Sequence, residues 1–370
     1  MKKSLLGLFS VCVSFQVVLC QTGNSCVTVD GGLGNCILLT NCQQYWKLIV
    51  DRSNTDVLRK AHCGFEGKMP KVCCPPIVVT TTTTTPSVVR SKLSSENFVP
   101  ALPDPPICGL SNASFSRIIE GVDAKLGDFP WMALLGFKFD QTTTWGCGGS
   151  LITSRHVITA AHCIHNYEDI LYVVRLGELD LAREDEGATP MDFLIKNMIK
   201  HEQYSRNKVV NDIGILILDK DVQFTELIRP ICIPKESQFL SETFENYTPL
   251  VAGWGRTKFD GLPATRLQVV QLPVISTNIC AESYAAYKQV QFDNLMCAGL
   301  LAGGKDACKG DSGGPLMQPI WSVKDKKLYF YNIGIVSFGI GCAKPKTPGV
   351  YTRVTRYVTW IKEKVLGQVP

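Results

Sequence analysis

The hexapeptide Gly310-Asp311-Ser312-Gly313-Gly314-Pro315 is the most informative stretch of this chain. A serine hydroxyl is a poor nucleophile at neutral pH. It needs a general base, a group that orients the base, and donors for the oxyanion that forms. The stretch therefore predicts a nucleophile at Ser312, and the rest of the chain must supply its partners.

The order of residues along the chain decides between two folds. The hexapeptide also satisfies the G-x-S-x-G elbow of the α/β-hydrolase fold, in which the histidine follows the serine. All five histidines of this chain precede Ser312, and they are His62, His156, His162, His165 and His201. The α/β-hydrolase fold is therefore excluded.

His162 is the candidate base, because it ends the apolar run at residues 157–161 and adjoins Cys163, which can pin its backbone. The other histidines lie in polar surroundings, and we expect them to be exposed or to have packing roles. Asp212 is the candidate orienting acid, because it precedes the apolar run at residues 213–218. A carboxylate at the mouth of a buried strand needs a partner, and an imidazole N–H is a suitable one.

Length and composition indicate a secreted globular protein with more than one unit. The chain has 370 residues, more than a single hydrophobic core usually holds. Of these residues 45% are hydrophobic and 19% are charged, as in globular proteins. Two lysines followed by the apolar run at residues 5–19 predict a secretory signal at residues 1–20, with a retained signal anchor as the alternative. Its removal lowers the net charge from +5 to +3, because two lysines and no acids are lost. We expect neither a nucleic-acid partner nor a membrane partner.

The cysteines indicate disulfides in an oxidising compartment. Sixteen cysteines, two of them in the signal, leave fourteen and allow up to seven bridges. Six of them crowd into about fifty residues, and these are Cys26, Cys36, Cys42, Cys63, Cys73 and Cys74. So short a unit must be stapled by disulfides, and the sequence alone leaves the connectivity open. A zinc site is the alternative, but no C-x-x-C pair occurs.

A linker separates this unit from the rest of the chain. Residues 75–107 are rich in Pro, Thr, Ser and Val, and six consecutive threonines occupy residues 80–85. Such a segment cannot bury a core and is typical of an extended linker. A strand of β-branched residues is the alternative, but prolines bracket the run.

Short apolar runs broken by Gly, Pro and Asn fill the chain beyond residue 118 and predict an all-β barrel or sandwich. The runs lie at residues 131–139, 150–160, 171–177, 213–218, 250–253, 267–275, 328–338 and 349–352. The end of the chain departs from this pattern. Apolar residues spaced between Tyr357 and Val365 predict a terminal amphipathic helix.

Together these motifs resemble the chymotrypsin family of serine proteases. The resemblance covers residues 118 to about 367 and rests on I-I-E-G, T-A-A-H-C, D-I, G-W-G, G-D-S-G-G-P and S-F-G. It implies two antiparallel six-stranded β-barrels and a C-terminal helix within residues 118–370. It also implies that Ser312, His162 and Asp212 are nucleophile, base and orienting acid, with the N–H groups of Gly310 and Ser312 as the oxyanion hole.

The resemblance also implies a substrate preference. Asp306 matches the acid at the base of the family's primary pocket, where a carboxylate selects Arg or Lys before the cut bond. Gly339 and Gly349 match the glycines of the pocket wall, and Ser337 is a further substrate-binding residue. A surface acid is the alternative for Asp306.

Residues 108–117 resemble the family's activation segment. Cleavage after Arg117 would free an ammonium group on Ile118, and burial of that cation requires a carboxylate, which the family takes from the position of Asp311. The ion pair would order the oxyanion loop, so activity awaits cleavage. An ordinary strand start is the alternative.

Disulfide pairs follow from two resemblances. The family pattern pairs Cys147 with Cys163, Cys280 with Cys297, Cys308 with Cys342 and Cys108 with Cys232, and the last bridge would tether the N-terminal piece after cleavage. Residues 21–74 resemble the clip domain of arthropod proteases, whose connectivity joins Cys26 to Cys73, Cys36 to Cys63 and Cys42 to Cys74.

The resulting hypothesis is a secreted zymogen of a trypsin-like endopeptidase in a haemolymph cascade of immunity, melanisation or clotting. The alternatives are a venom or digestive protease, or a clip-domain adaptor with little activity. The expected partners are a downstream zymogen as substrate, an upstream activating protease and a serpin-type inhibitor.

The proposed chemistry requires no cofactor. Glu178, Asp180 and the acids at residues 184–186 nevertheless fall where family members can carry a calcium-binding loop, and a solvated acidic loop is the alternative. Asn112 and Asn246 begin N-glycosylation sequons.

Overall fold

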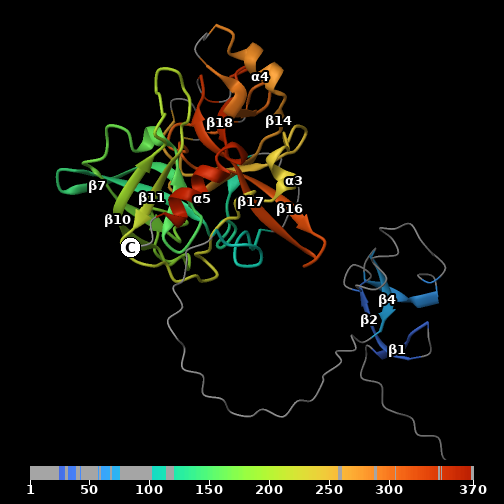
Figure 1. Ribbon diagram of the computed structural model, residues 1–370. Helices are drawn as coiled ribbons and strands as arrows, with labels where there is room; N and C mark the ends of the chain where they lie inside the picture. The colour runs from blue at the N-terminus through green and yellow to red at the C-terminus, as the bar shows by residue number, and fades with distance from the viewer. Residues whose placement is uncertain are drawn as a thin grey trace, which may run out of the picture. The chain divides into compact units, whose positions relative to one another are not determined.

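The computed structural model in Figure 1 describes most of the C-terminal unit and part of the N-terminal unit. The described residues are 25–29, 32–38, 42, 57, 60–66, 69–75, 102–113, 121–256, 261–286, 290–304, 306–340, 342 and 344–367. The chain divides into two compact units, Met1–Leu93 and Ser94–Pro370. The expected signal, most of the expected linker, and the expected cleavage site at Arg117 and Ile118 lie outside the described residues. No helix among the described residues is long and apolar enough to cross a membrane.

The first unit is a four-stranded antiparallel sheet in the order β1-β2-β4-β3. Its strands are β1 (Ser25–Val27), β2 (Leu33–Leu38), β3 (His62–Glu66) and β4 (Met69–Cys74). Its disulfides join Cys26 to Cys73, Cys36 to Cys63 and Cys42 to Cys74. Among its described residues the buried cluster consists of Cys42, Ala61 and Val72, with Ile37, Val57 and Cys74 packed against it. The disulfides add covalent cohesion to this cluster.

The second unit begins with a closed antiparallel barrel in the order β10-β11-β8-β7-β6-β9. Its strands are β6 (Met132–Phe139), β7 (Thr142–Leu151), β8 (His156–Thr159), β9 (Leu171–Leu176), β10 (Met191–Lys200) and β11 (Gly214–Leu218). β11 is buried along its whole length, which explains its uninterrupted apolar sequence. β10 has only Phe193 fully buried and closes the barrel without a clear apolar pattern, so the sequence did not predict it.

The remaining strands form a curled eight-stranded sheet in the order β14-β15-β18-β17-β16-β12-β13-β5. They are β5 (Val122–Asp123), β12 (Leu250–Gly253), β13 (Gln268–Gln271), β14 (Val274–Ile275), β15 (Leu295–Ala298), β16 (Pro315–Ser322), β17 (Lys327–Phe338) and β18 (Gly349–Arg353). The all-β architecture is confirmed. In the described residues the second barrel is an open sheet. Its two edge strands, β5 and β14, are two residues long each and do not pair with one another.

Short helices connect the strands. They are η2 (Ala161–Cys163), α3 (Ser237–Leu240), α4 (Thr277–Ser283), η3 (Phe292–Asn294), η4 (Val354–Arg356) and α5 (Val358–Leu366). α5 is the amphipathic terminal helix that the sequence predicts, with Val358, Trp360, Ile361 and Val365 buried. Its Trp360 indole donates to Glu202 Oε2 at 2.9 Å, which fixes the helix against the loop after β10.

Trp131 joins the barrel to the curled sheet. Its side chain is fully buried, and its indole N–H donates to the sulfur of Met317 on β16 at 2.9 Å. Its ring lies 5.2 Å from the ring of Phe330 on β17. Four disulfides cross-link this unit and join Cys108 to Cys232, Cys147 to Cys163, Cys280 to Cys297 and Cys308 to Cys342. All seven bridges of the structure are the pairs that the two resemblances implied.

Candidate active site

His162 lies in the short helix η2, directly after β8 of the closed barrel. Its neighbour Cys163 forms a disulfide to Cys147 on β7, so the backbone on one side of the imidazole is cross-linked to an adjacent strand. The His162 side chain is 27% exposed, and its Nδ1 lies 2.8 Å from Oδ2 of Asp212. The ring is thus accessible to solvent, while its Nδ1 is hydrogen-bonded to the buried Asp212 carboxylate.

Asp212 is a buried carboxylate with three donors. Only 3% of the residue is exposed. Oδ1 accepts the backbone N–H of His162 at 2.9 Å, and Oδ2 accepts the hydroxyl of Ser337 at 2.5 Å in addition to the imidazole. A buried charge is stable only when it is paired and hydrogen-bonded in this way. Because the carboxylate accepts the proton on Nδ1, the other ring nitrogen is left free to accept one.

Ser337 therefore has a contact that the sequence did not reveal. The resemblance gave it a role in substrate binding, and the structure adds a hydrogen bond to Asp212 from β17. The hydroxyl of Thr352 on β18 also donates to the Asp212 carbonyl at 2.8 Å. No sequence pattern identifies these two donors, since they come from strands more than a hundred residues further along the chain.

The backbone around Ser312 lies between the two sheets. Its carbonyl accepts from Gly148 N on β7 at 2.7 Å, and Gly313 N donates to Val336 O on β17 at 2.8 Å. Gly313 has φ +81°, and a Cβ there would lie 2.2 Å from the hydroxyl oxygen of Thr159. Glycine is therefore required at this position for both conformation and space.

No hydrogen bond joins the side chains of Ser312 and His162 among the described contacts. Contacts of this kind are often long without substrate and tighten when it binds. His162 Nε2 instead lies 3.7 Å from the sulfur of Cys163. In the described part of the chain, His162 with Cys147 and Cys163 is the one trio of potential metal ligands, and the disulfide leaves neither sulfur free to bind an ion.

Asp311 turns its carboxylate away from solvent, against the G-W-G segment. Oδ1 accepts from Gly255 N and Oδ2 from Cys308 N, both at 2.8 Å. A Cβ at Gly253 would lie 2.1 Å from Oδ1, so the glycines of that segment make room for the carboxylate. Desolvation raises the pKa of Asp311 from 3.8 to about 6, although the two hydrogen bonds oppose the shift.

Gly310 has φ +104°, and a Cβ there would lie 2.8 Å from Cα of Gly255. This left-handed conformation favours glycine. The same loop thus carries the candidate oxyanion donor at residue 310, the desolvated carboxylate at residue 311 and the candidate nucleophile at residue 312. A change at any one of them would disturb the others.

A pocket of about 230 Å³ opens beside Ser312. Ser337, Gly339 and Gly349, which the sequence predicts as pocket residues, line it together with the Cys308–Cys342 disulfide. Oδ1 of Asp306 lies 2.7 Å from the place where a Cβ at Gly349 would stand. The missing side chain at residue 349 therefore leaves room for the carboxylate beside the pocket.

Tyr351 is a pocket residue to which the sequence gave no role. It is fully buried on β18, lines the pocket and lies close to Asp306 and Asp311. Burial raises the pKa of Tyr351 well above its usual value, and the two nearby carboxylates raise it further. Its neutral hydroxyl is therefore a suitable neighbour for negative charge.

Among the described residues, no hydrogen bond or ring contact joins another histidine to this site. His156 on β8 is 3% exposed and shares a hydrogen bond of 2.7 Å between Nδ1 and the hydroxyl of Thr153. Burial lowers the pKa of His156 to about 4. His201 stacks on Trp360 with ring centroids 5.2 Å apart. The structure gives these residues packing roles.

The acidic loop after β9 was predicted as a calcium site. Glu178 and Asp180 are buried, but Glu178 Oε2 lies 3.3 Å from a guanidinium nitrogen of Arg175. Oε2 of Glu186 is buried and has no hydrogen-bond partner. Such an orphaned oxygen fits a cation ligand, whereas no three acidic side chains of the described residues converge within 4.8 Å. Carboxylates alone therefore do not complete a site.

The two sequon asparagines, Asn112 and Asn246, are both exposed. Asn246 has φ +68°, a conformation that asparagine tolerates in turns. Exposure at both positions is compatible with glycan attachment, which stays a prediction.

Two family models match the sequence. The model described as "Trypsin" matches residues 118–361, and the model described as "Regulatory CLIP domain of proteinases" matches residues 26–74. The chain is 42% identical to venom serine protease Bi-VSP of Bombus ignitus over 91% of each chain. It is 39% identical to the proclotting enzyme of Tachypleus tridentatus, over 90% of this chain and 88% of the relative.

A solved structure agrees with these matches. The Drosophila Grass clip serine protease of the Toll pathway aligns with a TM-score of 0.62 and 28% identity, over 94% of this chain and 98% of the other. The agreement extends over both units and not over the β-barrels alone.

We expect Ser337→Ala to lower kcat by about tenfold to a hundredfold, because a hydrogen bond to a charged acceptor contributes about 1.5–3 kcal/mol. Hydrolysis of a peptidyl-arginine amide by the activated chain measures this. Ser322→Ala is the matched control, since that hydroxyl bonds Asp325 in an outlying hairpin. A rise in KM with kcat unchanged would show instead that Ser337 only binds substrate.

Proposed function

We propose that this chain, which belongs to the trypsin family of serine proteases and carries a regulatory CLIP domain, is the secreted zymogen of an Arg/Lys-specific cascade enzyme. The observation that carries the catalytic assignment is the buried Asp212 carboxylate, which holds Nδ1 of His162 at 2.8 Å. In a family whose members hydrolyse peptide bonds, this contact supports Ser312, His162 and Asp212 as the triad.

In the proposed mechanism His162 acts first as a base and then as an acid in each half-reaction. His162 Nε2 takes the proton of Ser312 as its oxygen attacks the substrate carbonyl, and then gives that proton to the leaving amine. Asp212 stabilises the imidazolium and holds its tautomer. The N–H groups of Gly310 and Ser312 would receive the oxyanion, a contribution of about 3–4 kcal/mol per donor in related sites. Water then hydrolyses the acyl-enzyme by the same steps in reverse.

The proposed preference for Arg and Lys rests on Asp306. A carboxylate beside a narrow pocket attracts a guanidinium or ammonium, whereas a neutral side chain offers it no opposite charge. The space at Gly339 and Gly349 admits long side chains.

Asp306→Ser should reduce kcat/KM for peptidyl-arginine amides by about a thousandfold or more, because it removes the charge partner of the substrate. Activity on a phenylalanyl amide should change little. The exposed Asp123→Asn serves as the matched acid control, and Ser312→Ala sets the background rate. If Asp306→Ser kept its arginine preference, the assignment of Asp306 would be wrong.

The proposed zymogen switch rests on Asp311. The carboxylate is desolvated, and its two hydrogen bonds in the described residues come from neutral N–H groups, so it is a suitable partner for a new cation. Cleavage after Arg117 would supply that cation as the Ile118 ammonium. The disulfide between Cys108 and Cys232 would keep the N-terminal piece attached afterwards.

Cleavage should therefore stabilise the chain in a pH-dependent way. With its pKa raised to about 6, Asp311 favours the fold while protonated, and this contribution is lost as pH rises through about 6. The loss amounts to at most about 3 kcal/mol, and the new ammonium would offset it. We expect the melting temperature of cleaved Ser312→Ala protein to exceed that of intact protein by several degrees near pH 7.5, with little difference below about pH 4, where Asp311 is protonated in the folded and the unfolded chain.

The same comparison in the Asp311→Asn background is the control, because that variant has no charge to pair. A stability gain that is equal at both pH values, or that survives in Asp311→Asn, would contradict the switch.

The cascade assignment comes from the relatives. One is named a proclotting enzyme, and a structural neighbour is named for the Toll pathway. A disulfide-rich chain with a regulatory domain ahead of its protease suits extracellular, step-by-step activation. The proposed partners are an upstream protease, a downstream zymogen and a serpin-type inhibitor. The bumblebee relative is a venom protease, so the tissue that expresses the chain distinguishes the two settings.

Calcium is proposed as a structural ion of the loop after β9. Glu178, Asp180 and Glu186 would supply side-chain oxygens, with backbone carbonyls completing the shell. The ion would fix the loop and take no part in the chemistry. The orphaned Glu186 oxygen supports this proposal, and the ion pair between Arg175 and Glu178 opposes it.

We expect calcium, in contrast to magnesium, to raise the melting temperature of full-length Ser312→Ala protein by several degrees over a chelator control. Glu186→Gln should abolish the increase. Glu363→Gln, an exposed acid on α5, should leave it intact. Equal melting temperatures with and without calcium would exclude the ion.

A further inference from the structure

The described segment at residues 102–113 ends at Ala113, and its last residues are anchored to the catalytic unit. Cys108 is bonded to Cys232, and Gly109 O accepts from Phe330 N at 2.9 Å. The Ser111 hydroxyl donates to Asp128 O at 2.6 Å, and Asn112 N donates to Gly127 O at 3.1 Å. The starting point of the segment that leads to Arg117 is therefore fixed on one face of this unit.

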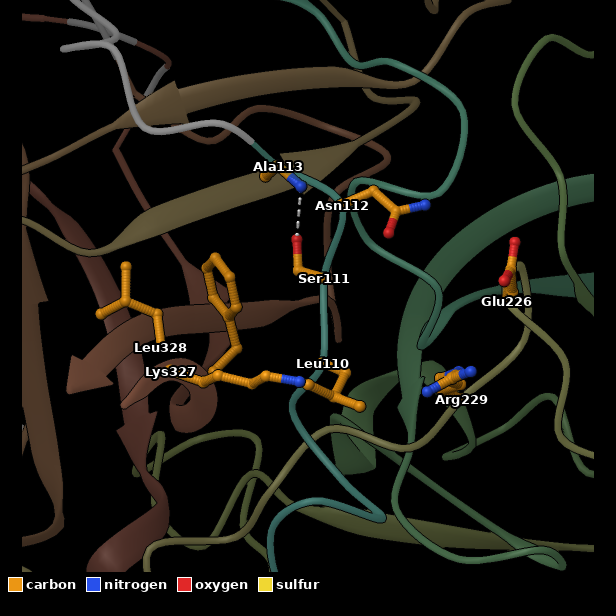
Figure 2. A pocket seen from close by; sticks show the side chains of 9 residues that line it. Leu110, Ser111, Asn112, Ala113, Glu226, Arg229, Lys327 and Leu328 are labelled. Carbon is orange, nitrogen blue, oxygen red and sulfur yellow. Dashed lines mark hydrogen bonds between the residues drawn. The ribbon is translucent and has the colours of Figure 1, made fainter. Parts of the chain in front are cut away.

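A pocket of about 380 Å³ lies against this anchored segment. Figure 2 shows Leu110 to Ala113 running between Lys327 and Leu328 on one side and Glu226 and Arg229 on the other. Two cations and one acid thus border a floor made by leucines and Phe330. None of the catalytic residues lines this pocket, so it is distinct from the active site.

The hairpin between β16 and β17 extends the rim of the pocket through Lys327 and Leu328. We call residues 321–327 the lysine hairpin, because Lys324, Lys326 and Lys327 are all exposed there. Trp321 is 52% exposed and Val323 is 80% exposed beside them. Single exposed apolar residues are common, but here an exposed tryptophan, a residue type enriched at protein interfaces, lies on the same hairpin as three exposed lysines.

The tip of the lysine hairpin has a defined shape. The Ser322 hydroxyl donates to the Asp325 carboxylate at 2.8 Å and accepts from Asp325 N at 3.2 Å. Lys326 N donates to Ser322 O at 2.8 Å, and Lys326 takes a left-handed conformation with φ +51°. Asp325, the acid of this turn, is thus hydrogen-bonded within the turn. The patch is presented by an ordered turn, which lowers the entropic cost of binding.

Chain length indicates what covers this face. Arg117 lies four residues beyond Ala113, so the bond after it is at most about 14 Å from a point on the pocket wall. A protease that cuts there must hold residues on both sides of the bond in its cleft. Its body therefore stands over the surface around Ala113 while it works.

We propose that the lysine hairpin and the adjoining pocket are the docking surface for the protease that activates this chain, and that this activator presents an acidic and partly apolar face. The proposal rests on the proposed cleavage after Arg117. Complementary charge accelerates encounter about tenfold or more at low salt, and the exposed Trp321 adds apolar contact.

The proposal can be tested by comparing how fast an anionic trypsin and a cationic trypsin cleave this chain. Both prefer Arg, and they differ in net surface charge. The substrate is full-length Ser312→Ala protein, which cannot cut itself, and the readout is the rate at which the Ile118 N-terminus appears. The triple variant Lys324→Glu, Lys326→Glu, Lys327→Glu should be cut about tenfold more slowly by anionic trypsin and faster by cationic trypsin at low salt. High salt should reduce both effects.

The control is a second triple lysine-to-glutamate variant, with the three changes placed on the closed barrel. Lys138, Lys196 and Lys220 are exposed there, and their replacement by glutamate should leave the ratio of the two cleavage rates nearly unchanged. Trp321→Ala should slow both trypsins by about twofold to fivefold without the salt dependence. Circular dichroism of each variant verifies that it is folded.

Equal rates for the lysine-hairpin variant and wild type with both trypsins would overturn the proposal. The proposal would also be overturned if the Ser312→Ala protein self-associated and the triple lysine variant did not. The surface would then be an interface between two copies of this chain. A new N-terminus at a residue other than Ile118 would instead refute the proposed cleavage site.

Discussion

The rest of the catalytic unit depends on one buried charge, the carboxylate of Asp212. It enters from the end of the closed barrel and takes hydrogen bonds from His162 and, across the junction, from Ser337 of the curled sheet. Loss of a donor to a buried charge is far costlier than loss of an exposed contact. The hydrogen bonds that stabilise this one ion therefore link the two sheets directly. Trp131 and Met317 support that position at the apolar end of the junction.

Several residues of the hexapeptide around Ser312 meet separate structural requirements, and these requirements explain its composition. Residue 311 is a desolvated carboxylate held by the G-W-G segment, and residue 313 is a left-handed glycine beside Thr159. Neither requirement concerns the serine hydroxyl itself. Both fix the backbone from which the hydroxyl and the proposed oxyanion donors project, so a conformational change at Asp311 reaches the reaction centre directly.

The sequence was sufficient for features that depend on local pattern and chain order. It predicted most barrel strands and the terminal helix, and it singled out His162 and Asp212, whose side chains the structure joins by a hydrogen bond. It missed β10, because a strand with one fully buried residue has no apolar signature. It also missed the hydrogen bond from Ser337 to Asp212 and the position of Tyr351 beside two carboxylates. These contacts join residues far apart in the chain, and only the folded arrangement of strands brings them together.

The disulfide between Cys108 and Cys232 limits how an activator could distinguish intact from cleaved chain. The pocket beside the lysine hairpin has one wall from the segment before the proposed cut and the other from the catalytic unit, and this bridge holds both together. Cleavage after Arg117 would leave that wall in place, so the docking surface would be the same before and after the reaction. An activator bound there alone would be inhibited by its own product. Its selectivity for the intact chain must therefore come from the cleavable segment in its cleft, and the docking contacts must be weak enough to release the product once that segment is cut.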